Sequence, residues 1–195
     1  MKTNLILFTV IALAGGITAC SSSSDSEDTT KDQNEEVIEA TSTTDSAANA
    51  RKEDADFVME AAGGGMMEVE IGKMALTKAS SSEVKKFAQM MVDDHTKANN
   101  ELKALAEQKS ITLPAALTDK HQKMVDDLMK KSGKNFDKDY MDMMVSDHKK
   151  DIDAFKEASE DANDADIKAF ASKTLPTLTH HLDEAQRIEK KTDRM

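Results

Sequence analysis

Aromatic residues are scarce in this 195-residue chain, which has no Trp, one Tyr and six Phe. β-Sheets are rich in aromatic and β-branched side chains, whereas the Met, Leu and Ala that must fill this core are strong helix formers. Only two Pro are present to interrupt helices. The composition therefore predicts an all-α fold, and the length suits one domain of ordinary size.

The chain has a single cysteine, Cys20, which excludes a disulfide within one molecule. A positive Lys2 and an apolar run precede it, and this run is far shorter than the roughly 20 residues of a membrane span. The residues Ile-Thr-Ala-Cys that end at Cys20 are typical of a bacterial lipobox. We therefore predict a lipoprotein signal peptide at residues 1–19 and a lipid on Cys20. This lipid would anchor the protein in the cell envelope, on the outer membrane or a membrane facing the periplasm.

Positive charge is also in deficit, with 26 Lys and Arg against 37 Asp and Glu, a net charge of −11. Nucleic acid is therefore not an expected partner. Residues 20–53 are mostly Ser, Thr, Asp and Glu, a composition that buries too little surface to fold. We predict a disordered acidic tether there, followed by a folded domain at residues 54–191.

Apolar residues at helical spacing predict four long helices in that domain. We place the first at Phe57–Lys78, the second after a capping box of Ser80 and Glu83, the third at Phe136–Glu160, and the fourth from a cap at Asn163 to Lys190. A connector with a short extra helix, Asp119–Lys131, ends at Gly133 and leaves the direction of the third long helix open. The pattern predicts a four-helix bundle. The run Gly63–Gly65 indicates either a break in the first helix or a closely packed neighbour.

A short motif occurs twice, as Met90–His95 and again as Met143–His148. Each copy puts a histidine on the apolar stripe of its helix. The four stripes contain one inward ionisable residue each, near the middle of each helix: Glu68, His95, His148 and His181. Mid-helix positions of a bundle meet at one level, so we expect these four side chains to converge.

Three imidazoles and a carboxylate are suitable ligands for one zinc, copper or iron ion. Met91 and Met144 are additional candidate ligands, which would favour copper. The same cluster can instead be a buried hydrogen-bond network in a structural or stress-protective envelope module, or the four groups can fail to converge. Asp94 and Asp147 lie about 100° round the helix from the adjacent histidine, so we expect them on the solvated surface or, at most, in contact with a ligand histidine instead of the ion. No motif indicates catalysis, and the chain lacks the Glu-x-x-His motifs of a ferritin-type di-iron oxidase.

Four separated motifs, Ala62–Gly72, Val84–His95, Met143–His148 and Leu175–Leu182, resemble the bacterial family called domain of unknown function 4142. The resemblance covers residues from about 54 to 191 and implies an exported, ferritin-like helical protein. It carries Glu68, His95, His148 and His181 over as motif positions and assigns them no chemistry, so the function stays open.

Overall fold

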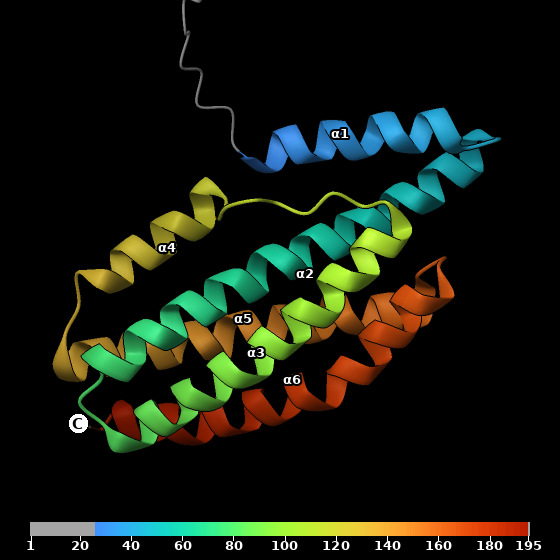
Figure 1. Cartoon of the computed structure of the whole chain (residues 1–195). Coiled ribbons are helices and arrows are strands. Elements are labelled where there is room, and N and C mark those ends of the chain that lie inside the picture. Colours follow the sequence, from blue (N-terminus) through green and yellow to red (C-terminus); the bar gives the residue numbers. More distant parts are fainter. Residues whose placement is uncertain (1–25, 195) are drawn as a thin grey trace, which may run out of the picture.

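The computed structural model describes residues 26–194, which form six helices and no strand (Figure 1). The all-α prediction is confirmed for this part of the chain. The helices are α1 (Ser26–Thr41), α2 (Asp45–Lys78), α3 (Ser82–Lys109), α4 (Asp119–Met129), α5 (Gly133–Asp161) and α6 (Ala165–Thr192). The predicted signal peptide and Cys20 lie outside the described residues.

The disordered tether predicted for residues 20–53 is wrong from residue 26 onward, because α1 and the first turns of α2 occupy that segment. Helix α1 buries Asn34 and Ile38 on one face. The Asn34 amide nitrogen donates to the Thr112 carbonyl at 3.0 Å, and the Thr112 amide donates to Asn34 Oδ1 at 2.7 Å. The residue that stabilises this polar helix is therefore far away in the sequence, and the composition of residues 20–53 alone cannot reveal it.

The four long helices α2, α3, α5 and α6 pack side by side as two hairpins (Figure 1). The most extensive packing is between α2 and α3 and between α5 and α6, and smaller contacts join α2 to α5 and α3 to α6. The connector between α3 and α5 carries α4, which packs on α2. Since Asp137 near the start of α5 binds Ser81 before the start of α3, helices α3 and α5 begin at the same end.

One buried aspartate from each hairpin binds the turn of the other. The backbone amides of Ser80 and Ser81 donate to the Asp137 carboxylate at 2.9 and 2.8 Å. At the opposite end, the amides of Asn163 and Asp164 donate to Asp54 at 2.8 and 2.7 Å. These two carboxylates fix both turns and so the relative position of the hairpins.

The predicted helix caps are each wrong by one residue. Ser81 caps α3 in place of Ser80, and Asp164 caps α6 in place of Asn163. Ser80 is unavailable because its hydroxyl binds Asp137. Gly133 does not end α4: it has a φ of +57° and begins α5.

Helix α2 is continuous through Gly63–Gly65, so the second of the two predicted explanations holds. A Cβ on Gly65 would overlap the Asn99 side chain, and a Cβ on Gly63 would lie 3.5 Å from the His121 ring. A Cβ on Gly64, in contrast, would meet no atom within 4 Å. A neighbour therefore packs too closely for a side chain at Gly65 alone; a Cβ on Gly63 would make an ordinary contact, and open space remains beside Gly64.

The core consists of two apolar clusters, one toward each end of the helices. The first includes Met91, Met144 and Tyr140, and the second includes Leu102, Phe155 and Leu178. Along each helix, the predicted inward ionisable residue falls between members of these two clusters. The polar groups thus form one layer across the middle of the molecule.

Candidate functional site

The polar layer contains one residue from each long helix: Glu68 of α2, His95 of α3, His148 of α5 and His181 of α6. Their exposed fractions are 2%, 6%, 0% and 0%. The predicted convergence of these four side chains is therefore found in the structure. Whether they hold a metal is a separate question, which depends on where their nitrogen and oxygen atoms lie.

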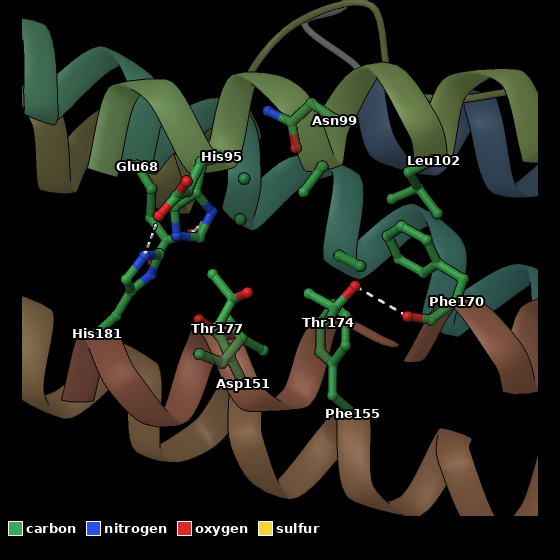
Figure 2. A pocket seen from close by; sticks show the side chains of 16 residues that line it. Glu68, His95, Asn99, Leu102, Asp151, Phe155, Phe170, Thr174, Thr177 and His181 are labelled. Atoms are coloured by element: carbon green, nitrogen blue, oxygen red, sulfur yellow. Dashed lines mark hydrogen bonds and ion pairs between the residues drawn. The ribbon is translucent and has the colours of Figure 1, made fainter. Parts of the chain in front are cut away.

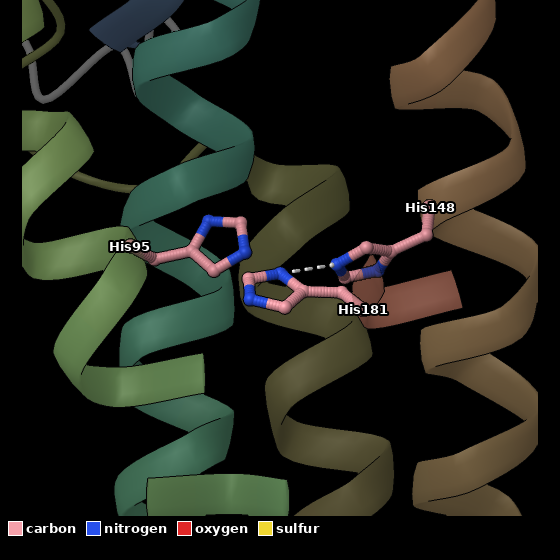
Figure 3. A group of neighbouring side chains, drawn as sticks. All are labelled: His95, His148 and His181. Carbon is pink, nitrogen blue, oxygen red and sulfur yellow. Dashed lines mark hydrogen bonds between the residues drawn. The ribbon is translucent and has the colours of Figure 1, made fainter. Parts of the chain in front are cut away.

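The three histidine rings face one another from three different helices (Figure 3). Their ring centroids are 5.2 to 5.6 Å apart. One nitrogen from each ring lies within 4.8 Å of the corresponding nitrogens of the other two. The rings therefore share one small space at the centre of the layer.

Each ring also has one nitrogen that faces an oxygen atom at the edge of the layer. His95 Nδ1 lies 2.9 Å from Glu68 Oε2, and His148 Nδ1 lies 3.0 Å from the Met144 carbonyl oxygen. His181 Nε2 lies 2.9 Å from Asp94 Oδ2. We call these three the outer nitrogens. Because a carbonyl or a carboxylate only accepts, each outer nitrogen carries a proton and donates it.

The remaining nitrogens, His95 Nε2, His148 Nε2 and His181 Nδ1, are the inner nitrogens. His148 Nε2 and His181 Nδ1 are 3.3 Å apart. His95 Nε2 is buried and has no hydrogen-bond partner. An unpartnered buried polar atom is costly, and here it belongs to a group of three.

The charges of Glu68 and His95 are set mainly by each other. Burial alone would raise the pKa of Glu68, but the neighbouring His95 and His148 outweigh it and lower this pKa to about 2. Burial alone would lower the pKa of His95, but the Glu68 carboxylate outweighs it and the pKa of His95 is raised. Glu68 is therefore ionised and favours a proton on His95.

The other two histidines are driven toward the neutral form. Burial lowers the pKa of His148, against the attraction of Glu68. Burial also lowers the pKa of His181 to about 4, against its hydrogen bond with Asp94. At neutral pH both rings have one proton, which the outer nitrogen holds. The two inner nitrogens that are 3.3 Å apart then present lone pairs to each other, with no proton to share.

Of three carboxyl groups near this layer, sequence analysis missed one, Asp151, and placed another, Asp147, wrongly on the surface. Asp94 is 42% exposed, as expected for a surface residue, yet its carboxylate accepts from His181. Asp147 is buried, contrary to the expected solvated position. Asp151 offers an oxygen within 4.8 Å of ligand atoms of Glu68 and His148, and burial raises its pKa to about 9. The sequence did contain one signal for Asp151: it follows His148 by three residues, which places both side chains on the same side of the helix.

The predicted thioether ligands, Met91 and Met144, are fully buried in the adjacent apolar cluster. Each precedes its histidine by one helical turn. Their position agrees with packing in the core, and their role as metal ligands stays a prediction.

A cavity of about 40 Å³ adjoins the polar layer (Figure 2). Glu68, His95 and His181 lie at one end, and Leu102 and Phe170 lie at the other. Residues of all four long helices line it, but His148 does not. The cavity therefore reaches the layer on the side of His95 and His181.

Comparison with known proteins gives one match. A family model described as "Domain of unknown function (DUF4142)" matches residues 39–188. No curated protein and no solved structure matches the chain. Within the described residues, no helix is both long and apolar enough to cross a membrane.

Proposed function

The chain belongs to the DUF4142 family, a domain of unknown function, and on that premise we propose from its own geometry that it binds one transition-metal ion in its core. The ligands are the inner nitrogens of His95, His148 and His181. The role is binding of the ion; a catalytic role has no support from any residue motif.

This proposal rests mainly on which ring nitrogens in the layer hold a proton and which do not. The three outer nitrogens hold protons because each faces an accepting oxygen. The inner nitrogens of His148 and His181 therefore present lone pairs to each other across 3.3 Å, and the inner nitrogen of His95 has no hydrogen-bond partner. A proton added to His181 is unfavourable above its pKa of about 4. A metal cation that displaces the second proton from His95 Nε2 satisfies all three nitrogens at once.

The distances are compatible with such an ion. Ligand atoms about 2.1 Å from a tetrahedral zinc ion lie about 3.4 Å from one another. The pair His148 Nε2 and His181 Nδ1 is already at 3.3 Å, and small rotations of the His95 ring would bring its nitrogen nearer. Neutral imidazoles suit zinc, copper and iron.

Glu68 has a different role in this proposal from the ligand role expected from the sequence. Its Oε2 atom accepts from His95 at 2.9 Å, and its Oε1 atom lies 3.4 Å from His148 Nδ1. Carboxylates that accept from the outer nitrogen of a metal-bound histidine fix the ring orientation and raise its basicity. Glu68 thus orients His95 and offsets part of the positive charge of the ion, while the Met144 carbonyl orients His148.

The cellular setting of the proposal rests on the sequence. Lipid on Cys20 would hold the protein on a bacterial envelope membrane, with residues 1–19 removed as a signal peptide. The two packed hairpins and their long connector support the finer fold assignment, a ferritin-like four-helix bundle.

The competing function is a structural or stress-protective envelope module, in which the layer is a hydrogen-bond network without metal. The close Glu68–His95 ion pair favours it, because that pair is satisfied without a cation. In this case chelators would leave the stability of the protein unchanged.

Metal analysis of the purified full chain separates the two functions. The chain is reconstituted with zinc, copper or iron and freed of loosely bound metal before analysis. We expect one equivalent of at least one metal per wild-type chain and per His180→Ala chain. We expect a loss of metal in His95→Ala and His148→Ala. His180 is the control because it is an exposed neighbour of His181. Substoichiometric metal in the wild type under all three conditions would end the proposal.

A further inference from the structure

The cavity beside the histidine layer lies where a three-histidine ion would have its free coordination position. Three protein ligands leave the fourth position of a tetrahedral ion open. His95 and His181 line the cavity and His148 does not, so His148 closes the opposite side. An ion among the inner nitrogens therefore has the cavity on the side of His95 and His181, which Figure 2 shows at one end of it.

The size of the cavity limits what can enter it. One water needs roughly 10–15 Å³ of such space, so about 40 Å³ holds roughly three waters. Leu102 and Phe170 make the end away from the histidines apolar, while Asn99, Thr174 and Thr177 add polar groups to the lining (Figure 2). A molecule that fills this space is small and has at least one end that tolerates an apolar surface.

The charge around the cavity disfavours anions. The carboxylates of Glu68 and Asp94 lie on its lining, and none of the described lining residues is Lys or Arg. Glu68 is 98% buried, where its charge is poorly screened. Two ionised carboxylates cancel the charge of a divalent ion among the neutral imidazoles, so an anion gains no net attraction that a neutral molecule lacks.

The absence of a side chain at Gly64 helps to keep this space open. Gly64 lines the cavity from α2, and a Cβ there would meet no atom within 4 Å. Ala98 lines it from α3 with the smallest side chain after glycine. Larger side chains at these two positions would fill the cavity from two different helices.

We propose that the metal ion keeps one coordination position open toward this cavity, and that a neutral molecule of one to three heavy atoms, such as water or a dissolved diatomic gas, binds there. This inference rests on the proposed metal site and adds a ligand to it. It concerns reversible coordination and involves no transfer of electrons or groups.

Nitric oxide is the test probe, because it is neutral, diatomic and a ligand of ferrous and cobaltous ions. The full chain is loaded anaerobically with iron(II) or cobalt(II), whichever reaches one ion per chain, and titrated while its electron paramagnetic resonance spectrum is recorded. We expect saturable binding of one nitric oxide per ion. Azide added to a second sample is expected to leave the visible spectrum of the ion unchanged.

Gly64→Leu and Ala98→Leu should retain one metal ion per chain and bind nitric oxide about tenfold more weakly or worse, because each side chain fills space that the probe needs. Gly64→Ala is the matched control and should bind it nearly as the wild type does.

Failure of this inference is distinct from failure of the proposed metal site. A fully loaded chain that does not respond to nitric oxide would overturn the open position and leave the metal site intact. Equal binding in the wild type and both leucine variants would show that the cavity is not the binding place. Azide that alters the visible spectrum would refute the preference for a neutral ligand. A chain that takes up neither iron nor cobalt overturns this inference, and a chain that takes up none of zinc, copper and iron overturns the metal site as well.

Discussion

Acidification of the metal-free protein should remove stability through His181 in particular. The pKa of this histidine falls from 6.5 to about 4 on folding, mainly because burial disfavours the charged ring. A lowered histidine pKa means that the unfolded chain binds the proton more tightly. The stability is therefore complete above pH 6.5 and is lost as the pH falls from 6.5 to about 4.

The size of this effect follows from the two pKa values. The interval between 6.5 and about 4 corresponds to about 3 kcal/mol of unfolding free energy, at roughly 1.4 kcal/mol for each pKa unit. His148 contributes in the same direction, because burial lowers its pKa too. His95 acts oppositely: its raised pKa adds stability that is full below pH 6.5 and is lost at higher pH. The lowered pKa of Glu68 gives stability that is present above pH 4.5 and is lost toward pH 2. Stability should therefore peak near neutral pH.

Urea unfolding followed by circular dichroism, with chelator present, measures this effect between about pH 7.5 and 4. The wild type should lose about 3 kcal/mol more than His181→Gln over this interval, because glutamine does not titrate. His180→Gln should behave as the wild type, since His180 is exposed. If the wild type and His181→Gln lost equal stability, the assignment of a neutral, buried His181 would be refuted.

Three further predictions concern single residues outside the histidines. Asp94→Ala should weaken metal binding by roughly 10- to 100-fold in a chelator competition, because His181 loses its hydrogen-bond acceptor. Asp94→Asn keeps an acceptor oxygen and should lose less affinity. Equal affinities in the wild type and Asp94→Ala would contradict this role. Gly64→Ala should raise the unfolding free energy by about 0.5–1 kcal/mol, because alanine is the better helix former and its Cβ has room there. Gly72→Ala should lower it, because its Cβ would lie 2.9 Å from Val92 Cγ2. Thermal unfolding midpoints that shift in the same direction for both variants would be inconsistent with this packing. Asp137→Ala should cost about 2–4 kcal/mol in urea unfolding because two turn amides lose their acceptor, and a loss below about 1 kcal/mol would argue against it.

Sequence periodicity predicted much of the helical body, because helical spacing is a property of each segment alone. The stripes that contain Glu68, His95, His148 and His181 were identified from single helices. Their meeting at one level followed from their positions near the middle of helices of similar length. The family assignment also came from motifs within single segments, and the family match to residues 39–188 confirms it.

Contacts between distant segments decided what the sequence could not. The order of α1 depends on the hydrogen bonds between Asn34 and Thr112. The cap of α3 is Ser81 because the Ser80 hydroxyl is hydrogen-bonded to Asp137. Asp94 lies about a quarter turn from the stripe of its own helix, so periodicity placed it in solvent, and only the packing of α6 brought His181 to it. The sequence by itself determined which side chains enter the layer, since that depends on spacing along one helix. Only the tertiary structure decided which nitrogen of each ring faces inward, because this depends on the rotation of the helices about their axes and, for His95 and His181, on oxygen acceptors that other helices supply.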